Sequence, residues 1–410
     1  MSTPGVDRRE FMIQAAGGLV AAAIVPNLAR AARPSGMAPV RVGVVGMGRQ
    51  GRSILAELSV IEGVELAAVC DVDERRLAAA QRRAADAATF ASIDDLLRAD
   101  AADAIIVATP THTHREVATR AIEGGRHVYC EGPIAHTMDD AVAIARAARA
   151  TDKVVAAGLQ GRSNPVYDLA RTFARSDSVR HVVAMRAQHN EKTSWVSPAS
   201  DQTRYGELNW RLDPERSTGL AGEWGTQQFD VFHWYLGRYP VRVIGHGSIQ
   251  EYDDGRKVHD TIACTLIFKD GSALQYGATL ANSYEDQYEV FYGTNAAIKL
   301  AWSHGWMFKE ADAPTQGWEV YANRQQFHKD EGITLIAGAT KLAEQGKLKE
   351  GVGLPHSSLY YALENWIGAI STGGEPACSI SEGARATAVG IAANRACVEG
   401  ASVDIELPDV

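Results

Sequence analysis

The chain has 410 residues, a formal net charge of −9 and a hydrophobic content of 46%, which are typical of a globular protein. Because this length exceeds that of one ordinary domain, two domains are expected. The acidic balance and the lack of a basic cluster in the sequence exclude a nucleic-acid-binding protein. The five cysteines are scattered and form no CxxC pair, which argues against a metal site and against a disulfide framework.

Residues 1–31 have the composition of an export signal. Arg8 and Arg9 precede an apolar run at residues 13–25, and the small residues of a cleavage site follow at residues 29–31. The paired arginines resemble a twin-arginine signal, which predicts export of the folded protein to the periplasm or the extracellular space. The run is too short to span a bilayer of roughly 30 Å, so we expect no membrane anchor in the mature form. An uncleaved anchor or an unstructured tail is the alternative.

Residues 38–160 alternate between short apolar runs and helical patterns. The runs cover residues 40–45, 64–70, 104–108, 126–130 and 153–157, and the helices begin near Gly51, Asp73, His114 and Met138. This alternation predicts a doubly wound parallel sheet of the Rossmann type. Ligands of such sheets bind beyond the carboxyl ends of the strands.

The first turn of this domain carries Gly46, Gly48 and Gly51 in the spacing GxGxxG, between an apolar run and a helical pattern. In such a turn the first glycine permits a tight bend, the second lets the backbone approach a pyrophosphate, and the third lets the helix pack closely on the strand. Asp71 ends the second apolar run and is placed to bind the ribose of NAD. The arginines at 75–76 leave NADP open as the alternative cofactor. A glycine-rich turn in an unrelated α/β protein is the structural alternative.

Residues 161–410 show a different pattern. Runs of period two cover residues 179–189, 241–250, 259–268, 272–281 and 286–292, and helical patterns cover residues 165–175, 225–236, 355–371 and 381–399. These runs predict a substrate-binding α+β domain with a large, open, mostly antiparallel sheet. The uncovered face of that sheet predicts a homo-oligomer.

Several motifs, taken in this order, resemble the Gfo/Idh/MocA (glucose–fructose oxidoreductase / inositol dehydrogenase) family over nearly the whole mature chain. They are residues 46–51 with Asp71, Thr109-Pro110 with His114, residues 125–133, Gly161-Arg162 with Pro165, and residues 222–230. The resemblance implies an NAD(P)-dependent oxidoreductase that acts on hydroxyls of sugars, cyclitols or related compounds. It also implies that the cofactor is bound by Gly46, Met47, Gly48, Arg49, Gln50, Gly51, Asp71, Thr109, Pro110, His114, Glu131 and Pro133.

The sequence departs from the family pattern where the family carries its catalytic residues. Gly132 replaces the lysine that holds the reacting hydroxyl, Glu223 and Gln227 replace an aspartate and a histidine, and Asp230 keeps its type. Since glutamine cannot act as a general base near neutral pH, the usual lysine–histidine chemistry is not expected. Glu223, Gln227 and Asp230 are spaced to share a helix face if the helix begins by Glu223. This predicts a polar wall of the substrate site, with a solvated or capping face as the alternative.

The candidates for acid–base catalysis therefore lie in the second domain. Glu223 is the first candidate, followed by His189 and Tyr205. The predicted substrate-binding residues are Arg162, Trp210, Arg211, Gln227 and Asp230. All eight tryptophans lie after residue 190, and flat aromatic rings can stack on sugars, although they also serve as ordinary core residues. No metal is predicted, because the histidines at 112 and 114 have no evident third ligand.

Three functions stay open at this point. The first is an exported oxidoreductase that acts on a small carbohydrate and holds its NAD tightly, because free nicotinamide nucleotide is expected to be scarce outside the cytoplasm. The second is a glycoside hydrolase or lyase that uses transient oxidation by bound NAD. The third is a sugar-binding protein that kept the fold and lost the chemistry.

Overall fold

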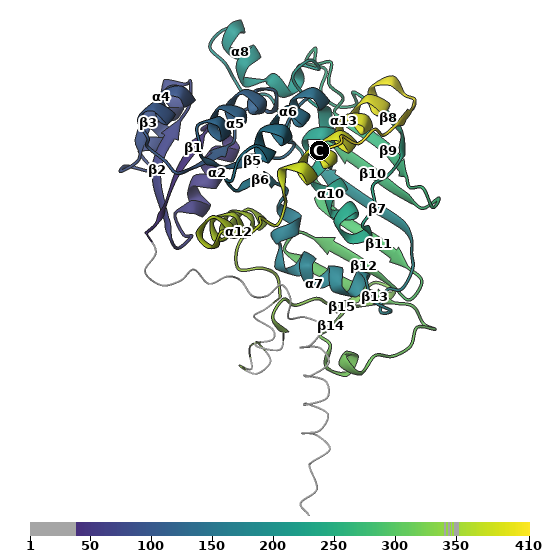
Figure 1. Ribbon diagram of the computed structural model, residues 1–410. Coiled ribbons are helices and arrows are strands. Elements are labelled where there is room, and N and C mark those ends of the chain that lie inside the picture. Colours follow the sequence, from purple (N-terminus) through teal and green to yellow (C-terminus); the bar gives the residue numbers. More distant parts are fainter. Residues whose placement is uncertain (1–37, 340–341, 343–344, 346, 348–351) are drawn as a thin grey trace, which may run out of the picture.

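The computed structural model describes residues 38–339, 342, 345, 347 and 352–410, so the predicted export signal at residues 1–31 lies outside the described residues. The first domain consists of β1 (Val40–Val45), α2 (Arg49–Leu58), β2 (Val64–Cys70), α3 (Glu74–Gln81), β3 (Ala88–Phe90), α4 (Ile93–Arg98), β4 (Ala104–Val107), η1 (Thr111–Thr113), α5 (His114–Glu123), β5 (His127–Glu131), α6 (Met138–Arg149) and β6 (Val155–Gly158). Its strands are parallel in the order β3-β2-β1-β4-β5-β6, which confirms the predicted Rossmann-type sheet (Figure 1).

The sequence analysis missed β3 and α4 of this sheet. The three residues of β3 lie at the sheet edge and are exposed or half-buried, so the sequence there carries no hydrophobic alternation. The six residues of α4 are too few for a helical period to be recognised.

The second domain begins with η2 (Gln160–Ser163), α7 (Pro165–Ala174), β7 (Val182–Asn190), α8 (Gln202–Leu208), η3 (Trp210–Leu212), α9 (Gly219–Glu223) and α10 (Gly225–Leu236). It continues with β8 (Arg242–Ser248), β9 (Thr261–Ile267), β10 (Ala273–Thr279), β11 (Gln287–Gly293), β12 (Ala296–Ala301), β13 (His304–Lys309), η4 (Gly317–Tyr321), β14 (Arg324–Phe327), β15 (Asp330–Thr334), α12 (Ser358–Thr372), α13 (Ile380–Glu399) and β16 (Ser402–Asp404). Its strands form one sheet in the order β14-β15-β13-β12-β11-β7-β10-β9-β8-β16. The pairings are antiparallel except for β7 with β10, which confirms the prediction of a mostly antiparallel sheet.

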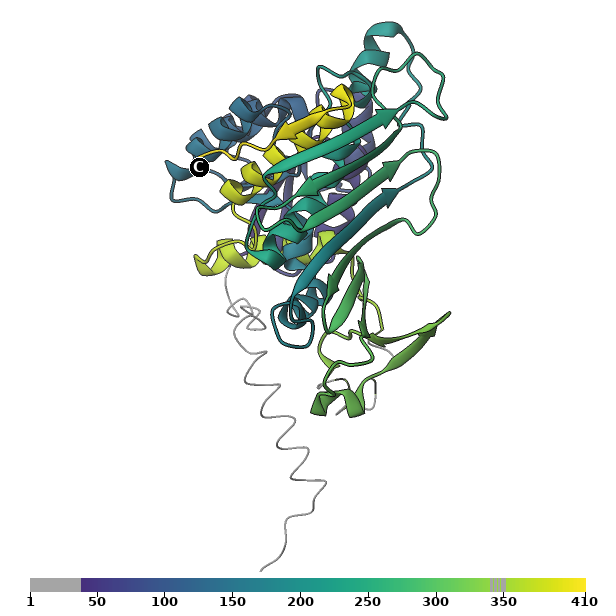
Figure 2. The same cartoon turned by 90° about the vertical axis from the view of Figure 1, so that its right-hand side faces the viewer.

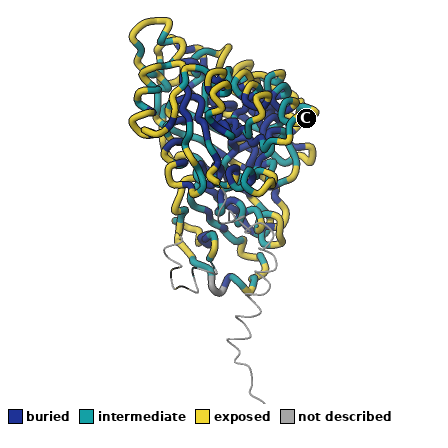
Figure 3. Tube along the Cα trace, turned by 60° about the vertical axis from the view of Figure 1, so that its left-hand side comes forward, coloured by how far each residue is buried: buried dark blue, intermediate teal, exposed yellow. Residues whose placement is uncertain are grey.

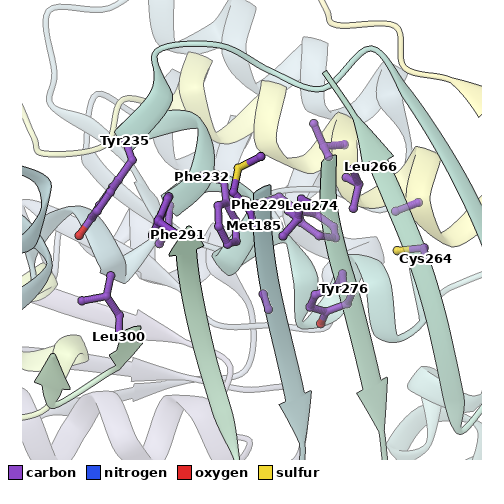
Figure 4. Close-up of a cluster of buried hydrophobic side chains, with 14 of the residues drawn as sticks. Met185, Phe229, Phe232, Tyr235, Cys264, Leu266, Leu274, Tyr276, Phe291 and Leu300 are labelled. Carbon is purple, nitrogen blue, oxygen red and sulfur yellow. The ribbon is translucent and has the colours of Figure 1, made fainter. Parts of the chain in front are cut away.

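The two faces of this sheet differ. On one face α7, α10 and α13 cover a core that includes Met185, Phe229 and Leu274 (Figure 4). The other face carries no helix in Figure 2, and side chains such as Ile244 and Tyr292 are 47% and 40% exposed there. Among the described helices, none is both long and apolar enough to cross a membrane.

The last two helices return to the first domain. Serine side chains cap both helices, Ser357 for α12 and Ser379 for α13. Trp366 of α12 is buried against the nucleotide-domain sheet, with its ring 5.7 Å from that of Tyr129, and Ile380 of α13 belongs to the same domain's core. The boundary predicted at residue 160 separates the two sheets, but α12 and the start of α13 beyond it contribute to the core of the first domain, and the buried segments meet in the middle of Figure 3.

A buried carboxyl group lies inside the second core. Glu289 of β11 is 0% exposed, and it accepts hydrogen bonds from Tyr167 Oη at 2.5 Å and from Gln228 Nε2 at 2.8 Å. Burial raises the pKa of Glu289 from 4.5 to about 7. Because the folded protein binds this proton more tightly than the unfolded chain, the stabilisation is complete below pH 4.5 and is lost as the pH rises through about 7.

We therefore expect Glu289→Gln to flatten the pH dependence of stability. A pKa rise of this size corresponds to roughly 3 kcal/mol of unfolding free energy lost between acidic pH and pH 8 in the wild type. Denaturant unfolding at pH 5 and at pH 8 measures the difference. Glu285→Gln, which changes an exposed carboxyl group of the preceding turn, is the control, and an equal slope in Glu289→Gln and wild type would contradict the expectation.

Candidate functional site

The glycine turn after β1 has room for a ligand at one place only among its three glycines. A Cβ at Gly46, whose φ is +98°, would lie 2.5 Å from Ala108 O, and a Cβ at Gly51 would lie 1.8 Å from Gly46 O. A Cβ at Gly48 would meet nothing closer than Arg76 Nη1 at 3.9 Å. No side chain caps the start of α2, so its first N–H groups are free to bind phosphate oxygens. The turn therefore fits a dinucleotide pyrophosphate at Gly48.

Asp71, at the end of β2, is tied to this turn. It is 7% exposed, and its Oδ2 accepts a hydrogen bond from Met47 N at 2.6 Å while its Oδ1 accepts one from Asp73 N at 2.8 Å. Burial raises the pKa of Asp71, and the nearby Arg76 opposes that rise. The carboxyl group thus orders the phosphate turn and lies at the corner where the ribose is expected.

His114 joins the loops that follow β4 and β5. It is 2% exposed, with Nε2 2.9 Å from Thr109 O and Nδ1 3.1 Å from Pro133 O. Burial lowers its pKa to about 4, so the ring is neutral at neutral pH. In the described part of the chain the buried hydroxyl of Thr109 has no hydrogen-bond partner, which leaves it free for a ligand.

Glu131 is a second buried carboxyl group at this edge of the sheet. It is 7% exposed, and its Oε1 accepts a hydrogen bond from Gln50 Nε2 at 3.0 Å. Burial raises the pKa of Glu131 from 4.5 to about 7. Its carboxyl group can therefore exchange a proton near neutral pH, a property that the sequence analysis did not assign to it.

Gly132 and Gln227, which are expected to replace the family's lysine and histidine, lie side by side. A Cβ at Gly132 would lie 2.8 Å from Leu159 Cδ2 and 3.3 Å from Gln227 Nε2. Gln227 donates a hydrogen bond to Gly158 O at 2.7 Å and accepts one from Gln160 N at 3.1 Å. The Gln227 amide therefore fixes the end of β6, and neither Gly132 nor Gln227 supplies a proton-transferring group.

Glu223 lies where the two domains meet. It is 8% exposed, its Oε2 accepts a hydrogen bond from Thr111 Oγ1 at 3.2 Å, and its Oε1 accepts one from Thr218 Oγ1 at 2.9 Å. Arg211 Nε lies 3.6 Å from Glu223 Oε2. The carboxylate of Glu223 thus contacts the loop after β4 of the first domain and a cation of the second.

The condition for a shared helix face is not met. The helix α9 ends at Glu223 and α10 begins at Gly225, so Glu223 does not lie on one continuous helix with Gln227 and Asp230. The backbone breaks at Trp224, whose ring stacks on that of His189 at 4.0 Å. The shared face was expected only if one helix began by Glu223, and the structure has a break there instead.

Arg162 and Asp230 form an ion pair inside the protein. Arg162 donates hydrogen bonds to Asp230 at 2.8 and 2.6 Å and to Glu382 at 3.0 Å, and the side chain of Asp230 is 1% exposed. His233 Nε2 lies 2.8 Å from the same Glu382 Oε2. All of these contacts are with protein groups and connect α10 to the start of α13. The substrate-binding role assigned to Arg162 and Asp230 stays a prediction.

Aromatic rings and an arginine surround His189 and Glu223. Trp195 meets Trp224 edge-on at 5.3 Å, and the Arg211 guanidinium lies 4.6 Å from the centre of the Trp210 ring. Burial lowers the pKa of His189 to about 3, so its ring is neutral. Such a wall can stack on the apolar face of a sugar. The sequence analysis did not select Trp195 or Trp224, although the crowding of tryptophan after residue 190 was the available signal.

Tyr205 lies elsewhere. It is half-buried on α8, which stands at the top of Figure 1, and its neighbour Arg204 pairs with Asp73 after β2. Tyr205 therefore belongs to the adenosine side of the cofactor edge. In the described residues no group of three or more His, Cys, Asp or Glu side chains is placed to hold a metal ion, and the five cysteines are free and buried.

Comparison with known proteins assigns the family. Residues 40–159 match the oxidoreductase family domain described as an NAD-binding Rossmann fold, and residues 183–405 match that family's C-terminal alpha/beta domain. The chain belongs to the Gfo/Idh/MocA oxidoreductase family. It is therefore an NAD-dependent oxidoreductase by family, and the free space at Gly48 with the unpaired Thr109 hydroxyl fits NAD.

Its relatives cover the chain to different extents. Inositol 2-dehydrogenase 1 of Saccharopolyspora erythraea is 27% identical over 90% of this chain and 97% of that protein. A glycosyl hydrolase family 109 protein of Shewanella baltica is 30% identical over 36% of this chain and 38% of its own length. The solved structure of levoglucosan dehydrogenase with NADH has a TM-score of 0.72 at 18% identity, over 90% of this chain and all of that chain, and shows the shared fold.

We expect Gly48→Val to abolish tight NAD binding without unfolding the protein, because the added side chain fills only the space that a pyrophosphate needs. Loss of one hydrogen bond to a charged phosphate, about 1.5–3 kcal/mol, weakens binding roughly 10–100-fold. Calorimetric titration with NAD and thermal unfolding measure both effects.

The matched control for this variant is Gly51→Ala, whose Cβ would lie 1.8 Å from Gly46 O. It should lower the unfolding temperature as well as NAD binding. Wild-type affinity in Gly48→Val would show that the dinucleotide does not approach this glycine.

Proposed function

We propose that this protein is an exported enzyme of carbohydrate chemistry that oxidises a sugar or glycoside with an NAD that it holds and recycles in place. The proposal is supported by a complete dinucleotide turn beside Gly132 and Gln227, which we take to occupy the family's lysine and histidine positions. Relatives named for inositol and levoglucosan support a polyhydroxylated substrate.

The chemistry requires a hydride acceptor and a proton acceptor. NAD, held by the turn at Gly48 together with Asp71 and Thr109, would supply the hydride acceptor for the carbon that carries the reacting hydroxyl. The proton of that hydroxyl passes to a protein group, and Glu223 is the first candidate because the hydrogen bonds of Thr111 and Thr218 fix its carboxylate. Trp195, Trp210 and Trp224 supply rings for the sugar, and Arg211 lies beside Glu223 to donate to a second oxygen.

The same groups suit a redox-neutral glycoside hydrolase or lyase, which is the second candidate. Oxidation of a hydroxyl acidifies the neighbouring C–H, a carboxylate then removes that proton, and the glycosidic oxygen leaves by elimination. Addition of water and return of the hydride would complete hydrolysis. Two observations favour this candidate: Gly132 contributes no side chain beside Gln227, and the chain resembles glycosyl hydrolase family 109 proteins over part of its length.

The open face of the second sheet suits a second copy of this chain. Val183, Ile244 and Tyr292 are 50%, 47% and 40% exposed on strands β7, β8 and β11. Exposed apolar side chains on a broad sheet that no helix covers can mark an association surface. We propose a homo-oligomer through this face, and a solution mass equal to that of one chain would contradict it.

We expect Glu223→Gln to lower turnover of the true substrate by about 10²–10⁴-fold, the usual contribution of general acid–base assistance. Its NAD content should not change, because Glu223 lies outside the phosphate turn. Product analysis on panels of free sugars and glycosides without added NAD measures turnover and separates the two candidates.

Glu215→Gln, which changes an exposed carboxyl group nearby in the chain, is the matched control and should keep full activity. Brisk reduction of soluble NAD by a free sugar, unaffected by Glu223→Gln, would overturn the assignment of this residue. A wild type that holds NAD and converts no panel member would instead favour a sugar-binding protein.

We expect Arg8→Lys with Arg9→Lys to keep the protein in the cytoplasm in a folded, NAD-containing form. The paired arginines are the feature of a twin-arginine signal, and they precede the first strand of the folded chain by some thirty residues. Fractionation of cells that express the full chain measures the location, and unchanged export of the double variant would point to another route.

A further inference from the structure

A segment of the second domain lies across the cofactor edge of the first, which is the sheet edge at the carboxyl ends of the strands, where NAD is expected. We call residues 191–217, between β7 and α9, the strap. Asn209, which is 3% exposed, holds the strap together, because its side chain donates to Ser197 O at 2.9 Å and accepts from Ser197 N at 2.6 Å. The strap is therefore an ordered part of the protein that carries α8 and η3.

The strap contacts the cofactor edge or its immediate surroundings at three points along its length. Glu191 Oε1 lies 3.5 Å from Arg49 Nη1, at the phosphate turn. Arg204 pairs with the carboxylate of Asp73, just after β2. Near its end the ring of Trp210 lies 5.8 Å from that of His112, in the loop after β4. The strap thus follows the line along which a dinucleotide would lie.

The Arg204 contact is the most enclosed of these. The side chains of Arg204 and Asp73 are 27% and 9% exposed, whereas those of Arg49 and Glu191 are 71% and 38% exposed. Asp73 is itself fixed, because its Oδ1 accepts a hydrogen bond from Arg75 N at 2.9 Å and caps α3. A partly buried ion pair to an anchored carboxylate is stronger than an exposed pair, which solvent screens.

Arg204 also lies beside the end of β2 and the start of α3, where the ribose is expected. Arg76 is within 3.6 Å of Asp73 and 3.9 Å of Asp71, and its Nη1 is the atom nearest to the free space at Gly48. Arg204 binds the same Asp73 from the opposite domain. The adenosine end of the site is therefore bounded on one side by Asp71 and Arg76 and on the other by Arg204.

We propose that Arg204, which comes from the second domain, is a cofactor-binding residue. The strap covers the adenosine half of NAD, and the Arg204–Asp73 ion pair keeps the strap closed. This inference rests on the proposed function in that it explains how the dinucleotide is retained. NAD then leaves only when the pair opens, so the pair sets the rate of release.

The test compares NAD release from the full chain and from Arg204→Ala. Protein loaded with NAD is mixed with an excess of a competing NAD analogue, and the loss of bound NAD is followed in time. We expect Arg204→Ala to release NAD about tenfold faster or more, as for the loss of one charge-assisted contact. Equal release rates would overturn the proposal.

The control variant is Glu207→Ala, which removes the other carboxylate that Arg204 contacts, at 3.5 Å on the same helix, and leaves Asp73 in place. It should release NAD at the wild-type rate. Asp73→Asn keeps a capping side chain and removes the charge, so it should speed release as Arg204→Ala does. Because Asp73→Asn also weakens the Arg76–Asp73 pair, the double variant should release NAD no faster than Asp73→Asn alone.

The NAD-release experiment can fail or succeed independently of the proposed function. Release is measured without substrate, so a protein that oxidises free sugars with soluble NAD would contradict the proposed function while Arg204→Ala could still speed release. A double variant whose effect equals the sum of the single effects would instead show that Arg204 and Asp73 act independently, and would overturn the role of the pair.

Discussion

The cofactor site depends on one steric constraint, the contact between the turn after β1 and the start of α2. No side chain fits at Gly51 or Gly46, because a Cβ would lie 1.8 Å from Gly46 O or 2.5 Å from Ala108 O. With both side chains absent, α2 begins directly against the sheet edge and directs its free N–H groups toward the ligand space. Asp71 then fixes the turn through Met47 N. The loops after β4 and β5 and the strap are positioned around this turn.

The second domain can contribute to this site because its last two helices pack into the core of the first. Trp366 of α12 packs beneath the nucleotide sheet, and α13 runs from the core of the first domain into that of the second. The ion pairs of Arg162 with Asp230 and Glu382 lie where α10 meets α13. Glu223 and the tryptophan rings are thus carried on elements that are packed onto the cofactor domain, which preorganises a site built from both.

The sequence predicted those elements whose residues alternate in burial. In β9, Ile262, Cys264 and Leu266 are buried at every second position, so the period is visible in the chain itself. The glycine turn was also predictable, because its GxGxxG spacing is a pattern of neighbouring residues in the chain. The break at Trp224 was not predicted, and the ring of His189 from β7 stacks on Trp224 there, a contact that the local sequence does not show. Nor could local sequence pair Arg204 with Asp73, which lies 131 residues earlier in the chain.

The surroundings of Gly132 and Gln227 leave no room for a larger side chain at Gly132. Leu159 and Gln227 occupy the space next to Gly132, and the Gln227 amide is used at both ends to hold the loop after β6, so a lysine could enter only if these neighbours moved. The two candidate carboxyl groups, those of Glu131 and Glu223, lie on different domains. Burial raises the pKa of Glu131 to about 7, whereas Glu223 is surrounded by hydroxyl donors and an arginine. Two carboxyl groups in such different surroundings are suited to different proton-transfer roles.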